Sequence, residues 1–200
     1  MTAQPDPTAT PEATVTPEPT AAPEGEVFTL VTSIDDVTAG DYVLYGVNGN
    51  YKGAMNNTVS SGHMGLTTVT VTDDTIVSPD SSVVWHMELA DGVYTLYNEA
   101  AGKYCMISED KTGGFSLGDE ATYGYTIAAA PTAGSYYMTT TLSGSSRMIS
   151  IYQNDFRPYG SGNWHDLFLY KRGGEAPDPT ATPDPTATPD PTATPEPTAT

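Results

Sequence analysis

The residues best suited to contact a ligand lie close together near the end of the chain. An amide, a carboxylate, a guanidinium and a phenol fall within six residues, as Asn154, Asp155, Arg157 and Tyr159. Side chains alternate between the two faces of a strand, so Phe156 should point inward while its charged neighbours point outward. Such a cluster would hydrogen-bond to a sugar ring and stack on it. The alternative is a surface strand with a local ion pair that contributes little to stability.

A repeated Trp-His dipeptide supplies a second candidate. For Trp164 the core is one interpretation and an exposed aromatic platform for a sugar is the other. The loop-like residues 161–163 (SGN) before it weaken the case for the core relative to Trp85. Trp85 lies in residues 83–89 (VVWHMEL), where alternation places it on the apolar face and His86 on the other. We therefore add Trp164 to the candidate ligand-binding residues and assign Trp85 to the core.

Metal binding and catalysis find little support. The three histidines, which are His63, His86 and His165, have no spacing that would bring them to one metal ion. His63 falls in residues 60–65, a loop-like stretch, and should be the most exposed of them. The paired acids Asp35-Asp36 and Asp73-Asp74 indicate turns, since neither pair has the ligand spacing of a calcium loop.

Nucleophilic chemistry is equally unsupported. The chain lacks a Gly-rich phosphate loop, a G-x-S-x-G motif and a Cys/His nucleophile arrangement. Its one cysteine, Cys105, lies in an apolar strand pattern and should be a small buried side chain that cannot form an intrachain disulfide. We expect no catalytic residue, no cofactor and no metal, and hence no enzyme activity.

Short strand patterns separated by turn residues position these side chains. The expected strands are 27–31, 41–45, 51–55, 66–71, 83–89, 93–97, 103–107, 115–117, 123–128, 136–142, 147–152, 156–159 and 163–170. Asn48-Gly49 and Asp91-Gly92 predict tight hairpin turns, because Asn, Asp and Gly tolerate positive φ. Helix signals are almost absent, so the sequence predicts an all-β fold.

A weak internal repeat refines this prediction. Tyr42, Tyr94 and Tyr136 each begin a similar strand, and 42 residues separate the last two. Three units of four short strands would form a β-trefoil-like fold, which we prefer. Another single compact closed antiparallel barrel is the alternative, and either would leave no sheet edge exposed.

Prolines divide the chain into three parts. Of 17 prolines, six lie in the first 23 residues and eight at or after Pro177. Residues 1–25 and 173–200 therefore read as disordered Pro/Thr/acidic linkers, the second built on the hexad PDPTAT, and residues 26–172 as one all-β module. Such repeats on both flanks favour a spacer between modules of a longer protein.

Charge restricts the partners. The net charge is −18, and neither linker contains a single base. An acidic chain without a Lys/Arg cluster repels phosphate backbones, so we expect no nucleic-acid partner. No stretch approaches 18 apolar residues, so we expect no membrane insertion. We also expect a monomer.

Eight short motifs follow one another along residues 28–171. They are FTLVTS from residue 28, GDYVLY from 40, SGH from 61, VWH from 84, YTLYN from 94, GKY from 102, NDFRPY from 154 and LFLYK from 167. Their order resembles an accessory β-domain of multi-modular secreted bacterial proteins. Proteins with that domain often carry nuclease, phosphatase, Ig-like or lamin-tail modules. GKY after a Tyr-rich strand is also similar, more weakly, to ricin-type and fascin-like trefoils. The resemblance implies a non-catalytic role.

Together these features predict a non-catalytic accessory module of a secreted or cell-surface bacterial protein, with the signal and anchor outside this chain. We expect it to bind a glycan or cell-surface polymer and to work beside other modules of the same polypeptide. The alternative is a structural spacer or protein-interaction domain without a small ligand, attached to a hydrolase such as a nuclease or phosphatase.

Overall fold

The computed structural model describes residues 26–160 and 165–173, and over these residues the chain is all-β, as the sequence predicts. The strands are β1 (Val27–Leu30), β2 (Gly40–Asn48), β3 (Tyr51–Ser60), β4 (His63–Thr67), β5 (Thr75–Val77), β6 (Val84–Ala90), β7 (Val93–Asn98), β8 (Lys103–Ile107), β9 (Phe115–Gly118), β10 (Thr126–Ala129), β11 (Tyr136–Leu142), β12 (Ser145–Tyr152), β13 (Asp155–Tyr159) and β14 (Asp166–Arg172). Two 3-10 turns, η1 (Ile34–Asp36) and η2 (Ser81–Val83), complete the described elements.

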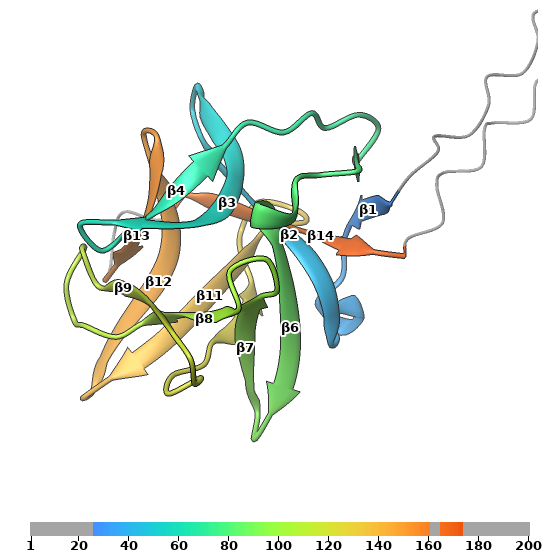
Figure 1. Ribbon diagram of the computed structural model, residues 1–200. Coiled ribbons are helices and arrows are strands. Elements are labelled where there is room, and N and C mark those ends of the chain that lie inside the picture. The colour runs from blue at the N-terminus through green and yellow to red at the C-terminus, as the bar shows by residue number, and fades with distance from the viewer. Residues whose placement is uncertain (1–25, 161–164, 174–200) are drawn as a thin grey trace, which may run out of the picture.

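The strands form one antiparallel sheet in the order β10-β11-β12-β13-β4-β3-β2-β6-β7-β8-β9. β14 pairs with β2 and β1, and β5 pairs with β1. Most neighbours are consecutive hairpins, so short turns set much of the register. Three pairs, β4 with β13, β2 with β14 and β1 with β14, join strands that are far apart in the sequence. These pairs bring the two ends of the described chain into one body (Figure 1).

The sheet is not closed, so the single compact closed barrel expected from the sequence is not confirmed. Its path ends at β9 on one side and at β10 on the other. β7 reaches the start of β10 only through the bridge Tyr94↔Tyr125, and β11 reaches β14 only through Ser135↔Phe168. A single residue pair does not form a ladder. All four residues of β10 pair with β11 instead, so the sheet does not continue from β7 into β10.

The three tyrosines of the sequence repeat contact one common segment. The hydroxyls of Tyr42, Tyr94 and Tyr136 donate hydrogen bonds to backbone carbonyls within residues 31–38, at 2.6, 2.7 and 3.0 Å respectively. Burial raises the pKa of Tyr42, and negative charge on Tyr94 or Tyr136 would raise it further. The first strand of each expected repeat, β2, β7 and β11, therefore packs its tyrosine against the same stretch of chain.

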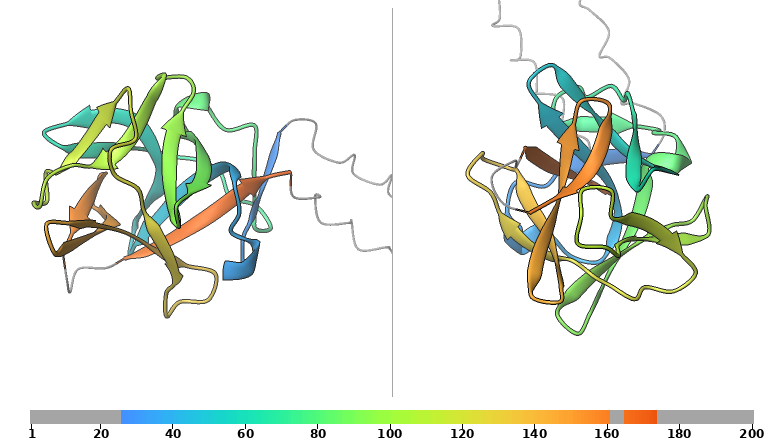
Figure 2. Two further views of the ribbon diagram at one scale, coloured as in Figure 1. Left: turned by 90° about the horizontal axis from the view of Figure 1, so that it is seen from below. Right: turned by 90° about the vertical axis from the view of Figure 1, so that its left-hand side faces the viewer.

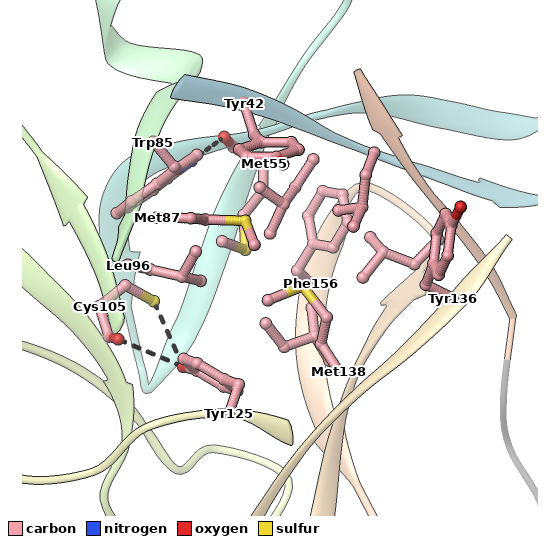
Figure 3. Close-up of a cluster of buried hydrophobic side chains, with 14 of the residues drawn as sticks. Tyr42, Met55, Trp85, Met87, Leu96, Cys105, Tyr125, Tyr136, Met138 and Phe156 are labelled. Atoms are coloured by element: carbon pink, nitrogen blue, oxygen red, sulfur yellow. Dashed lines mark hydrogen bonds between the residues drawn. The ribbon is translucent and has the colours of Figure 1, made fainter. Parts of the chain in front are cut away.

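A main core of buried side chains lies between these strands (Figure 3). Trp85 is fully buried, as expected, and its indole Nε1 donates to the carbonyl of Met55 at 2.9 Å. Cys105 is buried too, and burial raises the pKa of its thiol to about 12. The hydroxyl of Tyr125 donates to the carbonyl of Cys105 at 3.3 Å. The thiol is thus a packing group, since a protonated, inaccessible sulfur is inert.

A second, smaller core forms where β1 and β5 cover β2 and β14. Phe28 and Ile76 come from the covering strands, and Val43, Tyr45 and Tyr170 come from the covered ones. Tyr45 and Tyr170 meet edge to face with ring centroids 6.0 Å apart. β2 is therefore buried on both faces, which explains why it shows a continuous apolar run rather than alternation.

The segment around His63 differs from the expectation. Residues 60–65 read as a loop and 66–71 as a strand, but β3 extends to Ser60 and β4 starts at His63. A tight turn with φ of 53° at Ser61 and 74° at Gly62 joins them. Gly65 then passes so close to β3 that a Cβ there would lie 2.4 Å from Oδ1 of Asn56. The glycines that suggested a loop instead allow a turn and a close strand contact.

The two ends of the described fold lie side by side. The backbone N–H of Gly173 donates to the carbonyl of Val27 at 3.2 Å. The β12–β13 hairpin lies at the opposite end of the molecule (Figures 1 and 2). The segments expected to be disordered linkers, 1–25 and 173–200, fall outside the described residues apart from Gly173. Among the described residues, no helix is long and apolar enough to cross a membrane.

Candidate functional site

The β12–β13 hairpin positions four of the five predicted ligand-binding residues. The register is Tyr152↔Asp155, Ser150↔Arg157 and Met148↔Tyr159, so these six side chains share one face. Gln153, with φ of 53°, opens the two-residue turn, and Asn154 is exposed beside it. Phe156 points the other way and is fully buried, as alternation predicts. Alternation therefore assigned these side chains to the correct faces of the strand, and their role in binding stays a prediction.

Asp155 and Arg157 form a planar fork on this face. Nε of Arg157 donates to Oδ1 of Asp155 at 2.7 Å, and Nη2 donates to Oδ2 at 3.0 Å. These hydrogen bonds raise the pKa of Arg157 above its ordinary value. The guanidinium carbon lies 4.5 Å from the centroid of the Tyr152 ring, within cation–π range. The result is a rigid polar plate on an aromatic base, with no net charge.

Two tyrosine rings border this plate. Tyr152 is 38% exposed, and its ring centroid lies 6.3 Å from that of Tyr159 at an interplanar angle of 54°. Tyr159 is itself partly exposed and interacts with Arg157, which adds a smaller contribution to the raised pKa of the guanidinium. The face thus combines exposed rings with oriented donors and acceptors.

His63 is a member of this cluster that the sequence did not predict. β4 pairs with β13 through Asp155↔Gly65 and Phe156↔Met64, and Nδ1 of His63 lies 3.2 Å from Oδ2 of Asp155. The expectation that His63 is the most exposed histidine is wrong, since its side chain is 23% exposed and that of His86 is 50% exposed. We call His63, Tyr152, Asp155, Arg157 and Tyr159 the hairpin cluster.

Trp164, the fifth predicted residue, lies outside the described residues. The chain is described again from His165, whose backbone N–H donates to Oγ of Ser150 at 3.1 Å. Ser150 is the cross-strand partner of Arg157. The residue that follows Trp164 therefore lies next to the hairpin cluster, and a role for Trp164 in binding stays a prediction.

A hollow of about 430 Å³ continues this surface beyond Tyr159. Arg147, Met148 and Gly160 contribute to its lining. Nε of Arg147 donates to Oδ1 of Asp110 at 2.6 Å, and Nη2 donates to the Asp110 carbonyl at 2.9 Å. This contact lowers the pKa of the Asp110 carboxyl. Arg147 therefore holds the loop that carries Asp110 against β12.

A second polar cluster lies near the chain ends. Nδ1 of His86 lies 2.7 Å from Oδ1 of Asp41, and Arg172 reaches Asp41 and Glu26 through separate nitrogens, each at 3.3 Å. A hollow of about 450 Å³ adjoins these groups and is also lined by Tyr97. We call Glu26, Asp41, His86 and Arg172 the terminal cluster.

The terminal cluster does not assemble a Ser-His-Asp arrangement. Ser81 lines the same hollow, but no hydrogen bond joins it to His86 in the part of the chain that the structure describes. Over residues 26–160 and 165–173, no group of three or more His, Cys, Asp or Glu side chains is arranged to hold a metal ion. The paired acids lie in turns, Asp35-Asp36 in η1 and Asp73-Asp74 at positive φ.

No protein-family model matches this sequence, and no curated protein matches it either. Function is therefore inferred from the geometry of the two clusters and from their positions relative to the chain ends.

Proposed function

We propose that this chain is a non-catalytic module that binds a neutral glycan or cell-surface polymer through the hairpin cluster. The observation that carries the proposal is the Asp155–Arg157 fork stacked on Tyr152. Ligand sites typically combine aromatic surface with a few polar groups held in fixed orientations. Asp155 and Arg157 hold one another in place through two direct hydrogen bonds. The atoms of both groups that face outward can therefore exchange hydrogen bonds with sugar hydroxyls.

Charge selects the class of ligand. The carboxylate and guanidinium of the fork neutralise one another, and the rest of the chain is strongly acidic. An anionic polymer would be repelled by the net charge of −18, so a neutral polysaccharide is favoured. The same charge supports the expectation that nucleic acid is not a partner.

The position of the cluster supports a binding role over a purely structural one. The hairpin lies at the end of the molecule opposite Val27 and Gly173 (Figures 1 and 2). The chain therefore enters and leaves the described fold at the end remote from this face (Figure 1). Because Val27 and Gly173 are in hydrogen-bond contact, the folded unit adds little length between its neighbours. This favours the binding role over the alternative of a structural spacer or protein-interaction domain.

For the architecture we propose the β-trefoil-like arrangement, with another antiparallel barrel as the alternative. The ladders β14–β2, β2–β6, β6–β7 and β10–β11 would form a ring of six strands if the bridges Tyr94↔Tyr125 and Ser135↔Phe168 are counted as contacts. The hairpins β3–β4, β8–β9 and β12–β13 would lie outside that ring, one per repeat. The shared tyrosine contacts support this view.

We further propose that the module belongs to a secreted or cell-surface bacterial protein, as a monomer beside other modules of the same chain. The Pro/Thr-rich hexads on both flanks and the resemblance to an accessory β-domain support this. A nuclease or phosphatase neighbour would fit the resemblance as well as a glycoside hydrolase would.

Affinity electrophoresis of the full chain in gels containing starch, plant cell-wall polysaccharide, mucin or peptidoglycan tests the proposal. We expect retardation in at least one gel, and loss of that retardation in Tyr152→Ala, Tyr159→Ala and Trp164→Ala. Tyr123→Ala is the matched control, since Tyr123 is 37% exposed but lies outside the cluster. Normal mobility in all four gels would reject the glycan-binding role.

A further inference from the structure

The two ends of the fold are held by one edge of the sheet. β1 and β14 run antiparallel with Phe28 opposite Arg172, so the start of β1 lies beside the end of β14. The Gly173–Val27 hydrogen bond and an ion pair between Glu26 and Arg172, at 3.3 Å, close this end of the ladder. Tension applied through the flanking chain would enter the fold at this point.

We propose that the module is a force-yielding element, which opens at low tension when it is pulled through its own two ends. Force between Glu26 and Gly173 acts across the strands rather than along them. It would load the hydrogen-bonded pairs of β1 and β14 one after another, as in opening a zipper. Strands pulled along their length in opposite directions share the load over all their pairs, and so resist much more.

The ladders that hold β1 are short. β1 has only four residues, and it is held by three residue pairs on each side, to β14 and to β5. The ion pair adds little, because Glu26 and Arg172 are 56% and 39% exposed. Removing β1 uncovers Phe28, which is fully buried, and so opens the smaller core.

The next strand is also peeled from its end. β14 pairs with β2 from Lys171↔Tyr42 at the outer end to Asp166↔Val47 at the inner end. A pull on Gly173 would reach Lys171 first and Asp166 last, again one pair at a time. Neither end strand is therefore loaded in shear, and the main core would open once β14 has left.

The consequence is a reserve of length. The folded unit places Val27 and Gly173 3.2 Å apart, N to O, whereas unfolding residues 26–173 would release about 500 Å of chain at ~3.4 Å per residue. Pro-rich segments on both sides would transmit tension to these two points. This role does not depend on polymer binding, so the two proposals can fail separately.

Single-molecule pulling on the full chain tests this, with handles on its two termini in one set and on Asn50→Cys and the C-terminus in the other. Asn50 is exposed in the turn after β2, so the second set pulls β2 and β14 along their axes from opposite ends of the same ladder. Buried Cys105 should not compete for the handle. Asn48→Cys, at the end of β2 next to this turn, offers a second anchor.

We expect the terminal handles to unfold the module at clearly lower force than either turn anchor at the same loading rate. The length gain with terminal handles should match the whole of residues 26–173. Equal force in both geometries, or higher force with terminal handles, would overturn the proposal.

Discussion

The hairpin cluster and the terminal cluster use the same three side-chain types at opposite ends of the molecule. In each, one aspartate lies between a histidine and an arginine, as Asp155 in the first and Asp41 in the second. The arginines behave differently. Arg157 gives both hydrogen bonds of its fork to one carboxylate, whereas Arg172 divides its nitrogens between Asp41 and Glu26 at 3.3 Å each.

Distance along the chain explains the difference. Asp155 and Arg157 lie two residues apart on one strand, so the backbone alone sets them on the same face. Asp41 and Arg172 come from opposite ends of the described chain, where two carboxylates compete for one guanidinium. The comparison teaches that the same residue types form a two-bond fork in one place, which we propose as the binding face, and a contact between the chain ends in the other.

The largest effects should come from the phenylalanines beneath the two clusters. Phe156 packs so closely on β2 that a Cβ at Gly46 would lie 2.7 Å from its ring, and Phe28 lies 5.3 Å under the Arg172 guanidinium. Either change to Ala should lower the free energy of unfolding by about 3–5 kcal/mol in urea denaturation. Only Phe156→Ala should also remove polymer retention at temperatures where both variants stay folded. An equal loss of polymer retention in Phe156→Ala and Phe28→Ala would contradict the proposal that only the hairpin cluster binds the polymer.

The two aspartates give a sharper contrast. Asp155→Asn removes the charge that orients Arg157, so we expect polymer affinity to fall at least tenfold, a loss of about 1.4 kcal/mol. Asp41→Asn makes the same change in charge and shape in the terminal cluster, and should leave affinity within about twofold. Titration calorimetry with the retained polymer measures both, and a similar loss in the two variants would contradict the assignment of the binding face.

The dependence of stability on alkaline pH distinguishes the core from the two clusters. Arginines keep their protons there, so the loss of stability should come from buried groups such as Cys105, whose thiol pKa burial raises from 9.0 to about 12. Because the thiol pKa is higher in the folded state than in the unfolded state, the contribution of Cys105 to the free energy of unfolding is fully present below pH 9.0. That contribution is lost as pH rises toward 12. In Cys105→Ala the decline in urea midpoint should begin later, near pH 10, where buried tyrosines take over. Burial raises the pKa of Tyr125 well above 10.0 and that of Tyr170 from 10.0 to about 12. An unchanged onset would exclude the thiol as the cause.

The smallest effect should follow from His86→Gln. The His86 side chain is 50% exposed, and exposed ion pairs contribute about 0–1 kcal/mol. We expect a shift in unfolding free energy within about 0.5 kcal/mol and no change in polymer retention. A larger loss of stability would indicate that the terminal cluster, too, is a rigid arrangement.

The parts that local patterns control were predictable from sequence. Alternation placed Phe156 inside and Asp155 with Arg157 outside, and the Asp91-Gly92 turn is where it was expected. The turn expected at Asn48-Gly49 lies one residue later, at Gly49-Asn50, because Asn48 pairs with Tyr51. These features depend on neighbours two to four residues apart, whose geometry the strand or turn itself determines.

The features that depend on long-range strand register could not be predicted from the sequence. His63 reaches Asp155 only because β4 pairs with β13, and the turn glycines before it hid the strand. Nothing in the sequence aligns positions 41, 86 and 172, which meet through the pairing of β2 with β6 and with β14. The two single bridges, Tyr94↔Tyr125 and Ser135↔Phe168, which fall short of closing the sheet, also have no signal in the sequence.

The most direct test of the central claim is an amide chemical-shift titration of the full chain with a short oligosaccharide of the retained polymer. We predict that the shifts concentrate on β12, β13 and the start of β4, around Tyr152, Asp155 and His63, with the amides near Asp41 and His86 unchanged. Shifts centred on Asp41 and His86 instead would contradict the account.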